Sequence, residues 1–344
     1  MGALKDFKLN NFDLLRLLAA TQVVFDHYFQ HLNIPLTQTQ KNWLYLLPGV
    51  PVFFIISGYL ISASYERNNN IYIYIRNRLL RIFPGLWGCI LVTIIVITLT
   101  GASFVNKQVL LWLPAQLTGL IYTPGFLANY GFGSYNGSLW TIPIELQFYA
   151  LTPLCYLLLP KKQSGYWLGI LLFIFITFNI VCKLFSFGTV ANKLLDYSFI
   201  PHFYLFLTGV LLQRLKIYKS PLIYGKALYW FTAYAIFSLL LYRYFDPAVF
   251  LILKSLLLAV TLTAMAYSVP NLANRLLHTN DISYGIYIYH GLILTVMVQL
   301  KWAVTGYMNL LILLLLSYLL GFLSWIFIEK PFIKRKEKTI RKPI

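Results

Sequence analysis

Charged residues are scarce in this sequence, and acidic ones are the scarcest. Only 11% of the 344 residues are charged, with ten Asp and Glu against 28 Lys and Arg, while 59% are hydrophobic. A soluble domain of this length needs polar side chains to cover its surface, and this composition does not supply enough of them. The scarcity of charge therefore excludes an ordinary soluble domain and predicts a helical protein that crosses a bilayer many times.

Cysteine is rare as well. The three cysteines, Cys89, Cys155 and Cys182, are isolated from one another and lie in or beside apolar runs. Their number and spacing indicate neither a disulfide framework nor a metal site, so we expect no metal. The net charge of +18 would indicate a nucleic-acid partner in a soluble protein. In a membrane protein an excess of Lys and Arg marks the cytoplasmic loops, so we expect the lipid bilayer and no nucleic acid as partner.

Long apolar runs, by contrast, are abundant, and ten of them are long enough to span a bilayer as helices. They lie near residues 12–31, 46–64, 82–100, 138–159, 166–183, 197–213, 227–243, 248–268, 282–300 and 307–328. With the termini in the cytoplasm, 21 of the 28 Lys and Arg fall on the inner side, six fall on the outer side, and Lys254 lies within a span. This asymmetry predicts an all-α polytopic protein with both termini cytoplasmic. We expect a single membrane domain over residues 1–344, ending in a basic cytoplasmic tail at 329–344.

The longest outer connection, residues 101–137, is more than a polar loop. Its stretch VLLWLPAQLTGLIY is apolar but short for a span, which favours a re-entrant or interfacial helix. The following TPGFLANYGFGSYNGS mixes Gly, Asn and aromatic residues. Two interpretations stay open for these aromatics: stacking on sugar rings, or an ordinary interfacial belt of Tyr and Phe.

The first predicted span carries ionisable residues that hydrocarbon disfavours, among them Arg16, Asp26 and His27. Eleven helical residues amount to three turns plus roughly 20°, so Arg16 and His27 project from one face, about 16 Å apart along the axis. Asp26 can orient the His27 imidazole only where the backbone brings the two side chains together. A snorkelling arginine and a polar helix contact are the structural alternative, but the aligned set favours a functional site.

A basic run, IRNRLLRIFP, precedes the third span. In a helix, Arg78 and Arg81 would lie three residues apart on one face. They act either as topology determinants or as a phosphate clamp, because the guanidinium fork matches phosphate oxygens in geometry and charge.

Polar residues also lie within the fourth and ninth spans. In SLWTIPIELQFYA, Glu145 places a carboxylate in the hydrocarbon, where it needs a partner or a water-filled cavity, and Thr141 and Tyr149 lie one turn to either side. In ISYGIYIYHG, Tyr287 and His290 share a helix face. A single membrane histidine is more often a structural hydrogen-bonding group than a ligand.

Small residues in the second span have a structural interpretation too. Ser57 and Gly58 in FFIISGYLIS favour close helix packing over a nucleophile. The candidates for lining a pore or binding substrate are Ser57, Tyr149, Tyr287 and His290. The remaining histidines lie near the membrane interface or in loops and are not candidates: His31, His202 and His278.

Together these stretches resemble the acyltransferase family 3 of integral-membrane proteins, in the family's order and almost from end to end. The matching elements are Arg16 with ten residues between it and His27, FFIISGY around Ser57, RNRLLRIFP with Arg78 and Arg81, SLWTIPIELQFY around Glu145, SYGIYIYH ending at His290, and IEKPF closing at Phe332. No extracytoplasmic hydrolase-like domain follows. We therefore expect a single-domain member, similar to bacterial O-acetyltransferases of O-antigen, capsule or exopolysaccharide.

The resemblance implies a cytoplasmic acetyl-coenzyme A as donor co-substrate, a glycan acceptor that is free or lipid-linked, and a multi-pass location in the cell inner membrane. It implies that Arg16, Arg78 and Arg81 hold the phosphates of the donor. His27, oriented by Asp26, would take the proton of a sugar hydroxyl or carry the acetyl group itself, and Glu145 would position His27 or the acceptor.

One alternative of another class stays open, a flippase, exporter or polymerase of lipid-linked glycan without acyl transfer. Such proteins also have about ten spans, buried charges and aromatic outer loops. The aligned stripe from Arg16 to His27 begins at the cytoplasmic face, which favours a cytoplasmic donor. Within the enzyme class, a succinyl or longer acyl donor stays a variant of the acetyl prediction, because the sequence does not give the length of the pocket.

Overall fold

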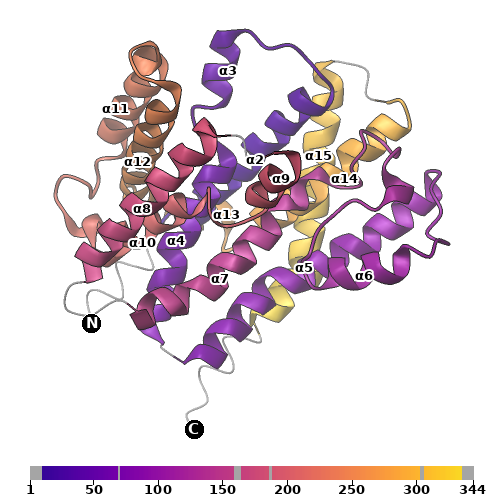
Figure 1. The fold of residues 1–344 in the computed structure, drawn as a ribbon, viewed down its shortest axis with the longest axis horizontal. Coiled ribbons are helices and arrows are strands. Elements are labelled where there is room, and N and C mark those ends of the chain that lie inside the picture. The colour runs from indigo at the N-terminus through magenta and orange to yellow at the C-terminus, as the bar shows by residue number, and fades with distance from the viewer. Residues whose placement is uncertain (1–9, 69, 159–163, 186–187, 303–305, 335–344) are drawn as a thin grey trace. The chain divides into compact units, whose positions relative to one another are not determined.

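The protein is built from helices. The structure, a computed structural model, describes residues 10–68, 70–158, 164–185, 188–302 and 306–334, and these residues contain no strand (Figure 1). The prediction of an all-α protein is confirmed. Residues 335–344 of the predicted basic tail lie outside the described part of the chain.

The long helices follow the apolar runs of the sequence. In chain order the helices are α2 (Phe12–His31), α3 (Gln38–Leu44), α4 (Gly49–Arg67), α5 (Ile71–Leu99), α6 (Val109–Leu117), α7 (Thr141–Leu158), α8 (Ser164–Leu184), α9 (Thr189–Asp196), α10 (Phe203–Arg214), α11 (Ala227–Leu240), α12 (Pro247–Ala266), α13 (Leu272–Leu277), α14 (Ser283–Gln299) and α15 (Tyr307–Ser324). Local signals set some of the ends. The Asp246 carboxylate accepts from the backbone N–H groups of Ala248 and Val249, and Pro247 occupies the first position of α12, where proline costs no hydrogen bond.

Five helical segments in the described chain are long and apolar enough to cross a membrane: Gln38–Arg67, Ile71–Leu99, Gly165–Leu184, Pro247–Ala266 and Tyr307–Lys334. The other predicted spans fall short for physical reasons. Helix α2 contains three charged residues, α7 has 18 residues that include Glu145 and two prolines, and α10, α11 and α14 have 12, 14 and 17 residues. The described chain therefore contains five helical segments of membrane-spanning length and composition, whereas ten spans and cytoplasmic termini stay predictions.

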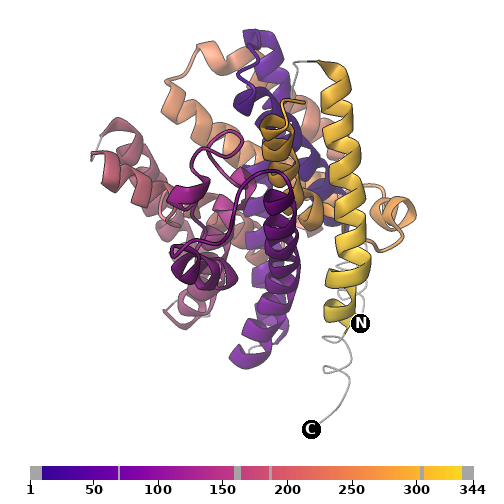
Figure 2. The same cartoon turned by 90° about the vertical axis from the view of Figure 1, so that its right-hand side faces the viewer.

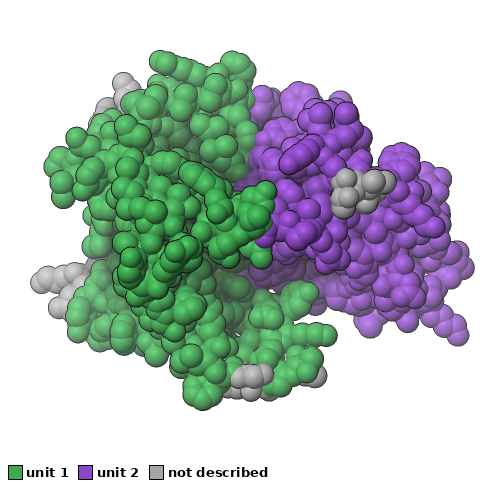
Figure 3. All heavy atoms as spheres, turned by 90° about the horizontal axis from the view of Figure 1, so that it is seen from above, with its two compact units in different colours: residues 1–19, 37–71, 147–279 green, residues 20–36, 72–146, 280–344 purple. Residues whose placement is uncertain are grey.

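The chain divides into two compact units, each assembled from separate stretches (Figure 3). Unit 1 comprises residues 1–19, 37–71 and 147–279, and unit 2 comprises residues 20–36, 72–146 and 280–344. Because each unit combines distant segments, its contacts depend on tertiary packing. The single membrane domain predicted from the sequence stays a prediction.

In unit 1, α10 packs closely against α4 and also contacts α8 and α12 (Figure 1). Glycines allow this approach. A Cβ atom on Gly58 would lie 2.0 Å from the carbonyl oxygen of Phe206, and one on Gly209 would lie 2.0 Å from that of Ile55. Any side chain would force the two helices apart. The helix-packing interpretation therefore holds at Gly58.

Unit 1 also contains a polar cluster that joins the ends of α4, α7 and α10. Glu66 Oε1 accepts hydrogen bonds from Arg214 at 2.5 Å and from the Tyr156 hydroxyl at 2.9 Å, while Oε2 accepts from Gln213 at 3.2 Å. Gln213 in turn accepts from the Ser62 hydroxyl at 3.0 Å. Both carboxylate oxygens of Glu66 are therefore satisfied, and its charge is balanced by Arg214.

In unit 2, α14 lies along α15 (Figure 2). The crossing is again made by glycines, since a Cβ atom on Gly285 would lie 2.7 Å from the Cα of Gly321. Helix α15 continues into one π-helical turn, Trp325–Glu329, which contains the start of the IEKPF motif. Such turns are rare and mark local irregularity in a helix.

The outer connection of unit 2 forms the short helix predicted there. Helix α6 has nine residues, too few to cross a bilayer. Its aromatics are largely inside the unit: Trp112 is buried, and the Tyr135 hydroxyl donates to Gln116 at 2.6 Å. The segment is thus a packed part of unit 2, and its position relative to a membrane stays a prediction.

Candidate functional site

Two histidines from helices far apart in the sequence meet in unit 2. His27 of α2 and His290 of α14 form a hydrogen bond of 2.9 Å between Nδ1 of His27 and Nε2 of His290. Their ring centroids are 4.9 Å apart. His27 is 9% exposed and His290 is fully buried, so the pair is shielded from solvent. The sequence identified both residues but gave no signal that they pair.

The other ring nitrogen of His290 also has a partner. Its Nδ1 lies 3.2 Å from the carbonyl oxygen of Ile286, one turn earlier in α14. The backbone near this turn is held by Asn136, whose Nδ2 donates to the Ile288 carbonyl at 2.7 Å. Gly291 permits this contact, because a Cβ atom there would lie 2.3 Å from Asn136 Oδ1. His290 is therefore held on both sides, and Asn136 is a supporting residue that the sequence analysis missed.

Asp26 has a described partner on its own helix. Its Oδ1 accepts from Gln30 Nε2 at 2.8 Å, an i,i+4 contact along α2. Consecutive helical side chains diverge by about 100°, so the carboxylate of Asp26 and the ring of His27 leave the helix in different directions. His290 makes the described hydrogen bond to His27, and the orientation of His27 by Asp26 stays a prediction.

His31 extends the cluster by one helical turn. Its ring centroid lies 5.2 Å from that of His27, and its ring stacks on Phe132 of the outer connection with centroids 3.9 Å apart and planes 11° apart. His31 was not a candidate from the sequence because of its position near the predicted membrane interface. The i,i+4 spacing from His27 was the signal that could have identified it.

A second polar pair brings the start of α7 to α14. The Thr141 hydroxyl and the Tyr287 hydroxyl are 2.7 Å apart, and the Tyr287 ring centroid lies 5.9 Å from that of His290. Glu145 follows Thr141 by one turn of α7 and is half-buried. Two predicted candidates, Tyr287 and His290, are thus neighbours in unit 2. The other two, Ser57 and Tyr149, belong to unit 1.

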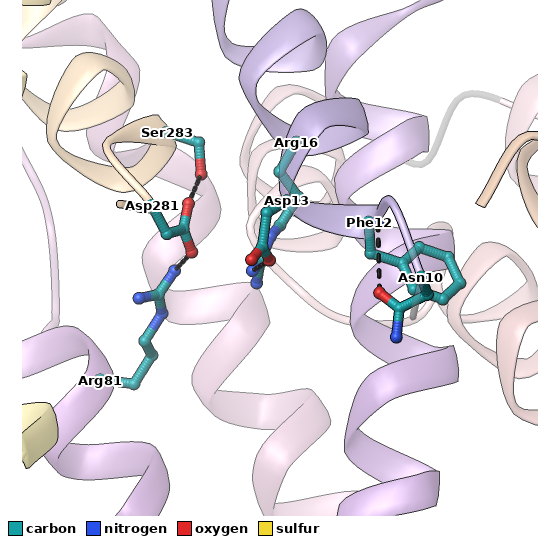
Figure 4. Close-up of polar contacts among 7 residues, drawn as sticks. All are labelled: Asn10, Phe12, Asp13, Arg16, Arg81, Asp281 and Ser283. Carbon is teal, nitrogen blue, oxygen red and sulfur yellow. Dashed lines mark hydrogen bonds and ion pairs between the residues drawn. The ribbon is translucent and has the colours of Figure 1, made fainter. Parts of the chain in front are cut away.

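Both arginines of the predicted phosphate clamp contact other side chains of the protein. Arg81 forms an ion pair with Asp281, and Asp281 accepts a hydrogen bond of 2.6 Å from the Ser283 hydroxyl (Figure 4). Arg78 lies with its guanidinium carbon 5.9 Å from the centre of the Tyr74 ring. The acid that orients Arg81 was not identified from the sequence, although it directly precedes the ninth predicted span.

Arg16, the third predicted clamp residue, belongs to unit 1. Its guanidinium pairs with Asp13 at 2.5 Å, an i,i+3 contact on α2 (Figure 4). Arg78 and Arg81 lie together in unit 2. Unit 2 therefore contains both predicted donor-binding arginines of the RNRLLR run, the histidine pair and Glu145.

The π-helical turn contributes one more acid to unit 2. Glu329 is buried, its Oε1 accepts from the Ser324 hydroxyl at 2.9 Å, and its Oε2 has no hydrogen-bond partner in the described chain. Nearby, Asn280 Oδ1 accepts from Trp325 Nε1 and Lys330 Nζ, each at 3.0 Å. The IEKPF motif thus packs against the start of α14. Among the described residues, no group of three or more His, Cys, Asp or Glu is arranged to hold a metal.

Comparison with known proteins identifies the class to which this helical protein belongs. Residues 9–329 match the acyltransferase domain of the acyltransferase 3 family, so the chain belongs to that family and is an acyltransferase. This assignment answers the open question of class in favour of acyl transfer over a transporter or polymerase.

Two relatives match over nearly their whole length. Nodulation protein 10 of Rhizobium leguminosarum bv. viciae is 29% identical, with 96% of this chain and 95% of the relative covered. An O-acetyl transferase of Shigella phage Sf6 is 24% identical, with 97% and 98% covered. No solved structure matches the chain.

Proposed function

We propose that this protein is an inner-membrane O-acetyltransferase that moves an acetyl group from cytoplasmic acetyl-coenzyme A to a hydroxyl of an extracytoplasmic or lipid-linked glycan. Family membership supports acyl transfer, and the name of the phage relative supports acetyl as the group and oxygen as the acceptor atom. The observation that carries the proposal is the buried hydrogen bond between His27 and His290, which places a held imidazole inside an acyltransferase.

The proposed topology has ten spans with both termini in the cytoplasm. Five helical segments meet the length and hydropathy expected of a span, and the strong excess of Lys and Arg on one side supports the orientation. In this topology α14 starts at the cytoplasmic side. Asp281 and Ser283 then lie at the entrance, and His290 lies seven residues further in, about 10 Å along the helix axis.

In the proposed reaction, His27 acts as the general base. It takes the proton of the acceptor hydroxyl as the oxygen attacks the thioester carbonyl. The new C–O bond forms, the C–S bond breaks, and the proton passes to the departing thiolate of coenzyme A. General-base assistance of this kind contributes about 10²–10⁴-fold to the rate. A route through acetyl-His27 would use the same ring and differs in having two transfer steps.

The donor would be held by the basic residues near the entrance. We propose that Arg78 and Arg81 bind phosphate groups of coenzyme A, with Arg16 contributing as a further cation. A guanidinium offers five N–H donors, so Arg81 can keep its bond to Asp281 while it binds phosphate. Asp281 would then orient the arginine for the donor.

The remaining candidates would act on the acceptor side. Glu145 and Tyr287 lie in the same unit as the histidine pair, and we propose that Glu145 positions the acceptor hydroxyl. Asp26 would contribute negative charge near the histidines, while Ser57 and Tyr149 stay candidates for lining the path of the substrate.

The choice of acyl donor is tested by competition. Succinyl-coenzyme A is added to a reaction with acetyl-coenzyme A, and the acyl group transferred to the glycan is identified.

The decisive experiment uses membranes from a strain whose chromosomal gene for this protein is deleted. These membranes supply the native acceptor without background activity of the wild-type protein. Membranes with the wild-type protein should transfer radiolabelled acetyl from acetyl-coenzyme A into the glycan fraction, and membranes with His27→Ala at equal expression should not. A matched control is His278→Asn, an exposed loop position with positive φ that Asn tolerates. Wild-type transfer by His27→Ala would remove His27 from the mechanism, and no transfer by the wild type would contradict the acetyltransferase proposal.

A further inference from the structure

We infer that His290 is a positioning residue that fixes the tautomer of His27, so that Nε2 of His27 is the bare nitrogen that accepts the proton from the substrate hydroxyl. This inference rests on the proposed role of His27 as the base. Two hydrogen bonds carry it, the one from His290 to the Ile286 carbonyl and the one between the two imidazoles.

The first hydrogen bond determines the protonation of His290. A carbonyl oxygen has no proton to donate, so the contact at 3.2 Å between His290 Nδ1 and the Ile286 oxygen requires a proton on Nδ1. A neutral imidazole carries one N–H. Nε2 of a neutral His290 is therefore bare and can only accept.

The second hydrogen bond then determines the protonation of His27. Because His290 Nε2 is the acceptor, His27 Nδ1 must carry the proton and donate it across the distance of 2.9 Å. A neutral His27 with its proton on Nδ1 has a lone pair on Nε2. The hydrogen bond found for His27 among the described residues is the one at Nδ1, which leaves Nε2 as the ring nitrogen that can accept from a substrate hydroxyl.

A charged His290 would carry protons on both ring nitrogens, so it would donate to His27 instead of accepting from it. The surroundings of His290 disfavour this charged form. A fully buried imidazolium needs a negative partner to offset its desolvation. The described hydrogen-bond partners of His290 are a carbonyl oxygen and another imidazole, and neither carries negative charge. The neutral form with its proton on Nδ1 is the form that satisfies both contacts.

The arrangement performs one part of what the aspartate does in a Ser-His-Asp triad, where an acceptor behind the imidazole selects the tautomer that leaves Nε2 free. The acceptor here is a neutral nitrogen. When His27 gains a proton, its bond to His290 becomes charge-assisted and strengthens. His290 would therefore both orient the base and stabilise the transition state, without touching the substrate.

Two variants of His290 separate this role from a packing role. His290→Phe keeps an aromatic ring and removes the acceptor, while His290→Gln can place an amide oxygen near the position of Nε2. We expect His290→Phe to lower kcat on the order of 10²-fold, with the KM for acetyl-coenzyme A changed less than about twofold, because the variant removes part of the base contribution. His290→Gln should recover most of kcat, and His278→Asn should behave as wild type.

A residue that only packs would give a different pattern, with loss of folded protein in both variants or equal losses of kcat. Wild-type kcat in folded His290→Phe, or no recovery in folded His290→Gln, would overturn the inference. These outcomes differ from failure of the proposed function, which His27→Ala with wild-type activity would show regardless of His290.

A measurement on the wild-type protein removes dependence on the folding of variants. Solid-state NMR of isotope-labelled histidine in lipid bilayers distinguishes protonated from bare ring nitrogens. The inference requires His27 with Nδ1 protonated and Nε2 bare, and His290 with Nδ1 protonated. A resting His27 with its proton on Nε2 would contradict it.

Discussion

Glu66 in unit 1 and His27 in unit 2 are both polar residues set among apolar helices, and their surroundings differ in kind. The carboxylate of Glu66 has a hydrogen-bond donor on each oxygen and a guanidinium that balances its charge. The hydrogen bond described for His27 is made by Nδ1 to a neutral imidazole, and the His27 ring also lies against that of His31. A satisfied network stabilises the packing of helices, whereas an open lone pair can take a proton from substrate.

The largest effect should come from removing the open nitrogen. His27→Ala deletes the proposed base and should lower kcat about 10²–10⁴-fold, since that is the usual contribution of a general base. The thermal unfolding temperature in detergent should fall less than in Glu66→Ala, because one buried atom, His290 Nε2, loses its partner instead of three. Acetyl transfer into glycan, normalised to folded protein, measures the first quantity and fluorescence-detected unfolding the second.

The opposite behaviour is expected at Glu66. Glu66→Ala leaves Arg214, Tyr156 and Gln213 without their common acceptor, so stability should fall by about 1–3 kcal/mol. Activity per folded molecule should stay near wild type, because the cluster holds helices of unit 1. If Glu66→Ala had the unfolding temperature of the wild type but a lower kcat, the contrast between the two clusters would be wrong.

An intermediate effect should appear at Arg78. Arg78→Ala removes a cation proposed to bind donor phosphate. The KM for acetyl-coenzyme A should rise about tenfold, because a charge-assisted hydrogen bond to the phosphate is lost. The kcat at saturating donor should change little, and Arg78→Lys should recover part of the affinity. An unchanged KM in the alanine variant would remove Arg78 from the donor site.

The smallest effect should follow the loss of one donor from the satisfied network. Tyr156→Phe removes a single hydrogen bond to Glu66, which keeps its bonds to Arg214 and Gln213. Stability should fall by about 0.5–1.5 kcal/mol, the net worth of an ordinary hydrogen bond. An unfolding temperature as low as that of Glu66→Ala would show that the network depends on Tyr156 more than its geometry indicates.

Much of the candidate site was predictable from local sequence. Arg16, His27, Arg78, Arg81, Glu145 and His290 were identified because ionisable residues in apolar runs are costly and therefore conspicuous. Their partners were not. Asp281 and Asn136 lie in connections between helices, where polar residues are ordinary, and nothing along the chain indicates that His290 lies beside His27 in space.

The sequence by itself determined the all-helical, membrane-type character of this protein. Composition and the length of apolar runs are local properties, and they decide whether a helix is stable in hydrocarbon. It also determined the acyltransferase family, through short motifs in a set order. Only the tertiary structure decided that His27 pairs with His290, 263 residues away, and that Arg81 pairs with Asp281, 200 residues away. Such pairs depend on how closely helices approach, which glycines such as Gly285 and Gly291 permit and which no periodicity along the chain records.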